Sequence, residues 1–99
     1  IAIEYQGVNV VVQIRGSRAW LKVWVDGRLD PDIGQSGRIF AAGRTLTFTG
    51  TTSVEVRTGS SGSTYFTVNG TSYGALGRAG IPETWLFEPP NEPVKTGRQ

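Results

Sequence analysis

Apolar side chains alternate with polar or small ones along two well-defined stretches of the chain. In Val8–Ile14, every second residue is a valine or an isoleucine. Successive side chains of a β-strand point to opposite faces, so this pattern predicts a strand that is buried on one face. The stretch Ala19–Val25 predicts a second strand, with Leu21, Val23 and Val25 on one face.

Shorter alternating runs predict further strands, and turn-forming residues separate them. The predicted strands cover residues 37–42, 45–49, 53–57, 64–68 and 84–87. Asp26-Gly27 and Asn69-Gly70 are typical two-residue turns of β-hairpins, because both positions tolerate a positive φ. The second hairpin is expected to return through Ser72 and Tyr73.

The remaining segments are expected to be irregular. Residues 28–36 contain Pro31, which cannot donate to a sheet, and they predict a loop or an irregular edge. The polar run 58–63 predicts a flexible connection, and residues 74–80 predict a glycine-rich loop. No segment shows a convincing helical period.

Seven or eight short strands with frequent turns are typical of all-β proteins. We therefore predict a small antiparallel β-sandwich, immunoglobulin-like or similar. The 99 residues, 37% of them hydrophobic, suffice for one small domain. We place that domain at residues 1–88 and interpret residues 89–99 as a tail, because three prolines lie within five residues there.

The composition narrows the possible chemistry. The chain contains no Cys, His or Met, which excludes disulfides, zinc fingers, haem ligands and Cys or His nucleophiles. No metal or other cofactor is predicted, and neither is catalysis. Since the sequence starts at Ile1 and not at Met, we expect a processed chain or part of a longer one.

The charge distribution argues against nucleic-acid binding. Ten Lys and Arg against eight Asp and Glu give a net charge of +2. The eight arginines are spread along the chain and form no basic stripe. No window reaches the 18 consecutive apolar residues of a membrane-spanning helix.

The order of four short motifs resembles a known family. The motifs are Arg18-Ala19-Trp20-Leu21-Lys22-Val23, Ala42-Gly43-Arg44 before Leu46-Thr47-Phe48, Phe66-Thr67-Val68-Asn69-Gly70, and Gly74-Ala75-Leu76-Gly77-Arg78-Ala79-Gly80. Together they resemble the extracytoplasmic C-terminal domain of RodZ-like bacterial cell-shape proteins, over about residues 8–88.

The resemblance implies a location and a set of partners. It implies an all-β domain on the outer side of the bacterial cytoplasmic membrane. There it would be tethered by one transmembrane helix to a cytoplasmic helix-turn-helix domain that binds the actin homologue MreB. It implies no catalytic residues and no small-molecule substrate.

The candidate interaction surface is a set of aromatic residues with one lysine. Trp20, Lys22 and Trp24 share one face of their predicted strand, and Tyr65 and Tyr73 flank the Asn69-Gly70 hairpin. Such residues can form a platform for sugar rings or for a protein partner. The alternative is that the tryptophans belong to a second buried face and the tyrosines pair across strands.

Two groups of carboxylates have structural interpretations. Asp26, Asp30 and Asp32 crowd one loop, where turn formation is a better interpretation than Ca²⁺ binding, because the spacing of a calcium loop is missing. Glu83, Glu88 and Glu92 could act as an acid–base pair in glycoside cleavage only if they were rigidly held. Two of them lie in or beside the predicted tail.

The leading hypothesis is a non-catalytic interaction domain that contacts cell-wall synthesis proteins or other envelope proteins. The alternative is a module that binds cell-wall glycan through Trp20, Trp24 and Tyr65. An enzyme ranks third. The spacing of Gly74, Gly77 and Gly80 matches no phosphate-binding motif.

Overall fold

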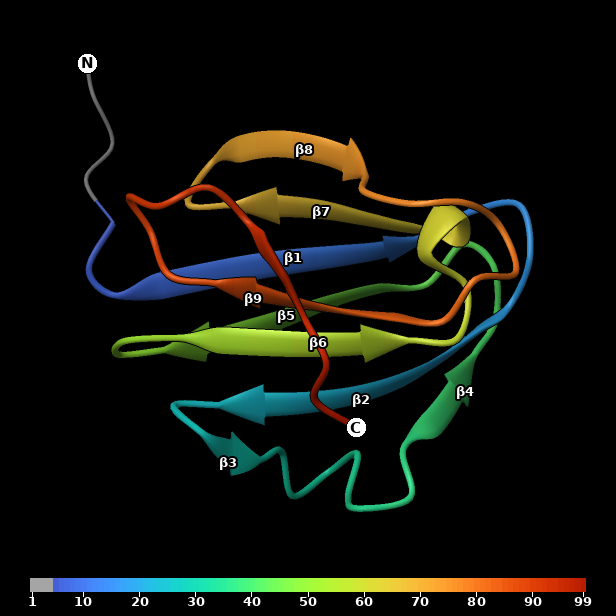
Figure 1. The fold of residues 1–99 in the computed structure, drawn as a ribbon, viewed down its shortest axis with the longest axis horizontal. Coiled ribbons are helices and arrows are strands. Elements are labelled where there is room, and N and C mark those ends of the chain that lie inside the picture. The colour runs from blue at the N-terminus through green and yellow to red at the C-terminus, as the bar shows by residue number, and fades with distance from the viewer. Residues whose placement is uncertain (1–4) are drawn as a thin grey trace.

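The computed structural model describes residues 5–99, which form two packed antiparallel sheets (Figure 1). The first five strands are β1 (Val8–Ile14), β2 (Ala19–Val25), β3 (Arg28–Leu29), β4 (Arg38–Phe40) and β5 (Thr45–Gly50). The others are β6 (Val54–Thr58), β7 (Thr64–Val68), β8 (Thr71–Ala75), β9 (Glu83–Phe87) and β10 (Val94–Thr96), with one 3-10 turn at Ser61–Ser63. The predicted all-β sandwich is confirmed.

The two sheets differ in size and composition. Sheet A has the strand order β5-β1-β7-β8, and sheet B has the order β10-β9-β6-β2-β3, with β4 also paired to β2. Every pairing is antiparallel. The predicted strand at residues 37–42 is present as the shorter β4, whereas β3 and β10 raise the count above the predicted seven or eight. Both additional strands are short and lie beside turn residues or prolines, which hide them in the sequence.

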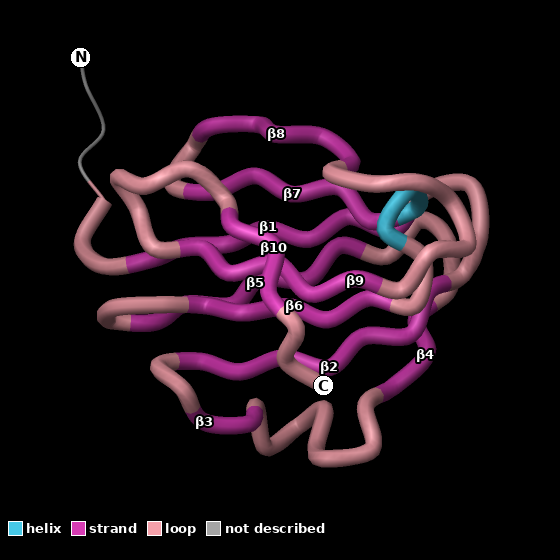
Figure 2. Tube along the Cα trace, in the orientation of Figure 1, coloured by secondary structure: helices cyan, strands magenta, loops and turns pink. Residues whose placement is uncertain are grey.

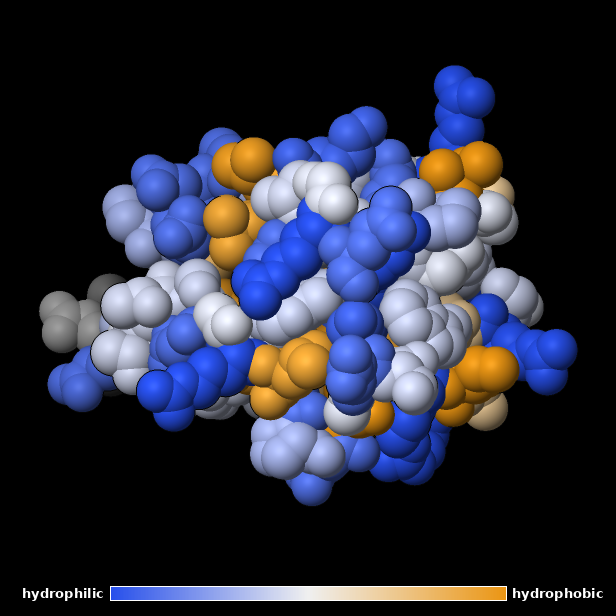
Figure 3. Space-filling view, turned by 60° about the horizontal axis from the view of Figure 1, so that its bottom comes forward, coloured by the Kyte–Doolittle hydropathy of each residue, from blue (hydrophilic) through white to orange (hydrophobic). Residues whose placement is uncertain are grey.

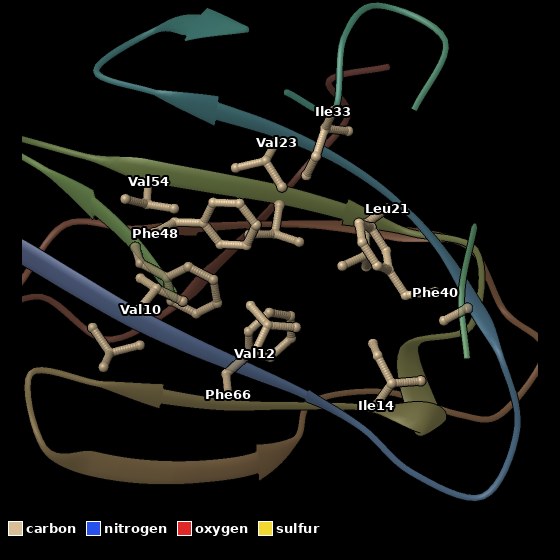
Figure 4. Close-up of a cluster of buried hydrophobic side chains, with 14 of the residues drawn as sticks. Val10, Val12, Ile14, Leu21, Val23, Ile33, Phe40, Phe48, Val54 and Phe66 are labelled. Carbon is tan, nitrogen blue, oxygen red and sulfur yellow. The ribbon is translucent and has the colours of Figure 1, made fainter. Parts of the chain in front are cut away.

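The core fills the space between the inner faces of the two sheets (Figure 4). The predicted inner face of β1 is confirmed, since Val8, Val10, Val12 and Ile14 are all buried. From β2, Leu21 and Val23 reach the core, whereas Val25 is only half-buried. The aromatic rings of the core are Phe40, Phe48, Phe66 and Phe87.

Both predicted two-residue hairpin turns are present. Asp26 and Gly27 have φ values of 53° and 81°, and Asn69 and Gly70 have values of 47° and 80°. Two consecutive positive φ angles are the signature of the turn whose twist matches that of the flanking strands. The Asp26-Gly27 turn joins β2 to β3.

The polar run at residues 58–63 is not the flexible connection that its composition predicts. Four residues of this run are buried: Thr58, Ser60, Ser61 and Ser63. Their hydroxyls have partners; the Thr58 and Thr64 oxygens lie 2.7 Å apart, and the Ser60 hydroxyl donates to Ser63 Oγ at 3.0 Å. Hydroxyl side chains that satisfy one another can be buried, so a serine-rich segment here is part of the core.

The C-terminal residues are not a separate tail. The prolines end at Pro93, and Val94–Thr96 then pairs with β9 at the edge of sheet B. Figure 2 shows this segment crossing in front of β9 and β6, with the C-terminal end lying over β2. The folded unit therefore continues past residue 88. Among residues 5–99, no helix has the length and apolar character needed to cross a membrane.

Candidate functional site

The predicted row of Trp20, Lys22 and Trp24 lies on the outer face of β2 in sheet B. The structure distinguishes the two tryptophans, because Trp24 is only 4% exposed whereas Trp20 is half-buried. The interpretation as a second buried face therefore applies to Trp24. Trp20, Lys22 and Trp24 therefore do not form a fully exposed aromatic platform.

Trp20 is held by the segment between β3 and β4. Its indole Nε1 donates a hydrogen bond to the Ser36 carbonyl at 2.9 Å. Gly37 has a φ of +74°, and a Cβ atom there would overlap the Trp20 ring. The glycine thus permits both the turn and the close approach of the indole, which explains why one side of this ring is covered.

Trp24 is covered by the end of the chain. The Arg98 guanidinium lies 4.5 Å from the centre of the Trp24 ring, and the Lys22 ammonium lies 5.3 Å from it. Lys22 also donates a hydrogen bond to the Gln99 carbonyl at 2.9 Å. These contacts place two cations on an aromatic face, an arrangement that attracts through the ring quadrupole.

A buried carboxylate fixes this covering segment in place. Glu55, on the outer face of β6, is 7% exposed and accepts hydrogen bonds from Thr96 Oγ1 at 2.6 Å and Arg98 Nη1 at 3.1 Å. Arg98 Nη2 also donates to the Gly27 carbonyl at 3.2 Å. A buried charge needs such partners, so residues 96–99 and Glu55 depend on one another. We call this arrangement the C-terminal clasp.

The two predicted tyrosines lie elsewhere. Tyr65 is on the outer face of β7 in sheet A, where the Arg15 guanidinium lies 4.7 Å from its ring centre. Tyr73, on β8, is partly buried against the core. The five predicted residues therefore do not form one surface, and the glycan platform of Trp20, Trp24 and Tyr65 is wrong, since Trp24 is buried and Tyr65 belongs to the other sheet.

The turn interpretation of the aspartates is confirmed at two positions. Asp26 accepts hydrogen bonds from the backbone N–H groups of Thr51, Thr52 and Ser53. These bonds stabilise the charged form and hold the pKa of Asp26 far below the usual range of a carboxyl group. Asp30 accepts from the Ile33 N–H at 3.2 Å. Across residues 5–99, no cluster of three or more potential metal ligands occurs.

The C-terminal glutamates and the glycine-rich loop also have structural contacts. Glu83 forms an ion pair with Lys95 at 3.5 Å, whereas Glu88 and Glu92 are exposed. A Cβ atom at Gly77 would overlap the Glu83 carboxylate and the Ser61 hydroxyl, so this glycine allows the loop to pack closely. The second oxygen of Glu83, Oε1, is buried and has no hydrogen-bond partner within residues 5–99.

Tyr5, which the sequence pattern does not single out, lines a hollow. Tyr5, Tyr73 and Pro90 line this hollow of about 770 Å³, together with polar residues that include Thr52 and Asn69. The clasp side of the molecule, in contrast, shows only separate small apolar patches among hydrophilic residues (Figure 3).

Comparison with known proteins places the chain in a family. Residues 11–81 match the family model described as the RodZ C-terminal domain. No curated protein and no solved structure matches the chain. The matched range begins within β1 and ends before β9, so β9, β10 and residues 96–99 of the C-terminal clasp lie outside it, whereas Glu55 lies inside it.

Proposed function

Because the chain belongs to the RodZ C-terminal domain family, we propose that it is a non-catalytic interaction domain of a membrane-anchored cell-shape protein. The family match carries this proposal, since it covers most of the chain. In this proposal the domain lies on the extracytoplasmic side of a bacterial cytoplasmic membrane. Its partners are cell-wall synthesis proteins or other envelope proteins.

The use of polar groups in the fold supports binding rather than catalysis. Asp26 and Asp30 hold turns, Glu55 holds the clasp, and Glu83 pairs with Lys95. Catalysis by carboxylates requires two of them to converge on a substrate with different proton affinities. Here these four carboxylates are committed to neighbouring backbone or side-chain groups.

The proposal extends to the parent protein. We propose that one transmembrane helix precedes the domain and connects it to a cytoplasmic helix-turn-helix domain that binds MreB. The domain would then link the cytoskeleton to the envelope by binding an envelope protein, without catalysing a reaction.

A cysteine-labelling experiment tests the location. The chain has no cysteine, so Ser72→Cys in the parent protein, expressed without other cysteines, gives one exposed thiol on β8. A membrane-impermeant maleimide should label it in spheroplasts before lysis. Labelling that occurs only after lysis would contradict the extracytoplasmic location.

Crosslinking in cells tests the partner class. A photo-crosslinking amino acid placed in the parent protein at Lys22 samples sheet B, and one placed at Tyr65 samples sheet A. At least one should give an adduct with a cell-wall synthesis protein or another envelope protein. If neither these positions nor exposed positions on the sheet edges give an adduct, the interaction function is contradicted.

A further inference from the structure

Strand β5 is an open edge of sheet A. The Ile14 N–H donates to the Arg44 carbonyl at 2.9 Å, and β1 and β5 stay in register from there to Gly50. Hydrogen-bonded pairs alternate in an antiparallel ladder, so Leu46, Phe48 and Gly50 bond to β1. The N–H and C=O groups of the alternate residues, Thr45, Thr47 and Thr49, therefore point away from the sheet.

The other sheet edges are short or irregular, and β5 is neither. Strand β10 has three residues, including Lys95, and follows Pro93; β3 has two residues and β4 has three. Strand β8 pairs with β7 through a register shift, and Gly74 there has a φ of +69°. Short strands, charges, prolines and bulges protect edges from pairing. The six residues of β5 contain no proline and no charge.

Open space lies beside the free edge of β5. Two hollows of about 360 and 280 Å³ lie there and share Asp30, Thr47 and Phe48 as lining residues. Figure 1 shows that β2 and β3 continue past β5, so sheet B extends beyond the edge of sheet A. We call the two hollows together the β5 groove.

The lining of the β5 groove combines apolar side chains with charged and polar ones. Val25 and Leu29 line one hollow, and Ile33, Phe40 and Leu46 line the other. In Figure 4, Ile33 lies on the sheet B side of the core and Phe40 lies near Leu21; both residues line the same hollow as Phe48 of β5. An added strand would have free backbone groups along one side and apolar side chains beneath it, which are the two elements of peptide recognition by strand addition.

One end of the groove carries cations without acidic partners. The guanidinium carbons of Arg38 and Arg44 lie 5.4 and 5.5 Å from the centre of the Phe40 ring. Among residues 5–99, neither arginine forms an ion pair with a carboxylate. The same hollow is also lined by Asp30 and Asp32, and the Asp30 carboxylate accepts a hydrogen bond from the Ile33 N–H. Because neither aspartate is ion-paired with Arg38 or Arg44 among residues 5–99, the two guanidinium groups keep donors that can bind a carboxylate of a ligand.

We propose that β5 binds an extended peptide segment of a partner protein, which adds to sheet A as an antiparallel strand and presents a carboxylate to Arg38 and Arg44. This inference rests on the proposed function and names its binding surface. Antiparallel addition places the C-terminal end of the segment beside Arg44, where β5 begins. Its apolar side chains then alternate into the β5 groove.

A second copy of the chain fits this edge less well than a single strand. Pairing of β5 with β5 of another copy would put the β3–β4 segments of both copies on the same side of the joined sheet. Each segment already lines the groove of its own copy through Asp30, Ile33 and Arg38. The two segments would compete for the same space, whereas a lone peptide strand would not.

A synthetic peptide provides the probe. The peptide alternates valine and threonine over five residues and ends in two glutamates, and its control ends in two glutamines. Bound to the 99-residue chain, it should slow amide hydrogen exchange at Thr45, Thr47 and Thr49, with no change at Thr71 on β8. The glutamine control should bind about 2- to 10-fold more weakly, as expected for exposed charge pairs.

Variants of the protein test the same contacts by changing the residues that would bind the peptide. The double variant Arg38→Gln, Arg44→Gln should lose the preference for glutamate over glutamine, whereas Arg78→Gln, an exposed arginine in another loop, should retain it. Thr47→Pro removes one outward N–H and should abolish binding. If Thr47→Pro does not fold, the arginine variants still decide the question.

Several outcomes would overturn the inference. One is the absence of protection at the three threonines at saturating peptide. Another is protection that rises with protein concentration without peptide, together with a dimer in sedimentation, which would assign the edge to a second copy. A third is crosslinking in cells that persists unchanged in a folded Thr47→Pro parent protein; the proposed function would then stand while the β5 surface would be wrong.

Discussion

The strands β5 and β10 lie at the edges of different sheets, and the two edges differ in length, charge and covering. Strand β10 is short, carries Lys95 and leads directly into the clasp that covers Trp24. Strand β5 is twice as long, uncharged and leaves its outer threonines in solvent. Because an uncovered regular edge is a template for pairing, this contrast is the reason for proposing β5, and not β10, as the binding edge.

The largest expected effect is the loss of stability when the buried indole of Trp24 is removed. Trp24→Ala should lower the free energy of unfolding by about 3 to 5 kcal/mol, because it removes a buried aromatic ring and leaves a cavity. Urea unfolding of the 99-residue chain measures this directly. A loss below about 1 kcal/mol would show that residues 96–99 do not bury Trp24.

The next effect tests the clasp itself. Arg98→Ala should cost about 1 to 3 kcal/mol, because the buried Glu55 carboxylate loses a charged donor. Arg78→Ala is the matched control and should stay within about 0.5 kcal/mol, because Arg78 is exposed and forms no ion pair with another of residues 5–99. Equal losses in both variants would contradict the coupling of Glu55 to Arg98.

A pair of threonines on the two outer faces sharpens the comparison. Thr84 on β9 is fully buried; its hydroxyl donates to the Arg98 carbonyl at 2.6 Å and accepts from Arg57 at 3.1 Å. Thr84→Val should therefore cost about 1 to 2 kcal/mol. Thr47→Val, the same change on exposed β5, should stay within about 0.5 kcal/mol. Urea unfolding of the two variants compares the covered outer face of sheet B with the exposed outer face of sheet A. A larger loss for Thr47→Val than for Thr84→Val would contradict this assignment of the two faces.

The smallest expected effect concerns the turn that ends β5. The pKa of Asp26 is lowered by the N–H groups of Thr51, Thr52 and Ser53, so the folded state favours the carboxylate. This stabilisation is present above the unfolded pKa of about 3.9 and declines as the pH falls below it. Asp26→Asn, which keeps a residue that tolerates a positive φ, should be less stable at pH 7.

The pH dependence is the specific test of that turn. The stability gap between the wild-type chain and Asp26→Asn should shrink steadily below about pH 4, because the unfolded wild-type chain then takes up a proton that the folded chain does not. Urea unfolding at pH 7, 5 and 3 measures the gap. A gap of the same size at pH 7 and pH 3 would exclude the carboxylate charge as its cause.

The local pattern of the sequence predicts much of the fold. The alternation in β1 and β2 and the Asp26-Gly27 and Asn69-Gly70 turns act through neighbouring residues, so the pattern locates them correctly. Strand β10 escapes prediction because it has three residues beside prolines, and its pairing with β9 is a tertiary contact.

The candidate site is harder to predict than the fold. Alternation places Trp20, Lys22 and Trp24 on one face, but it does not say what covers that face. The decisive contact joins Glu55 to Arg98, which lie 43 residues apart in the sequence. The open edge is equally hidden, because whether β5 is central or at an edge depends on the strand order and not on its own residues.

Hydrogen exchange along β5 in the free chain is the most direct test that this edge is open. The N–H groups of Leu46 and Phe48 bond to β1 and should exchange slowly, whereas those of Thr45, Thr47 and Thr49 should exchange at rates near those of unfolded peptides. Fast and slow amides should therefore alternate along the strand. Uniform protection of all five amides in the monomer would mean that the edge is already covered, and would contradict the account.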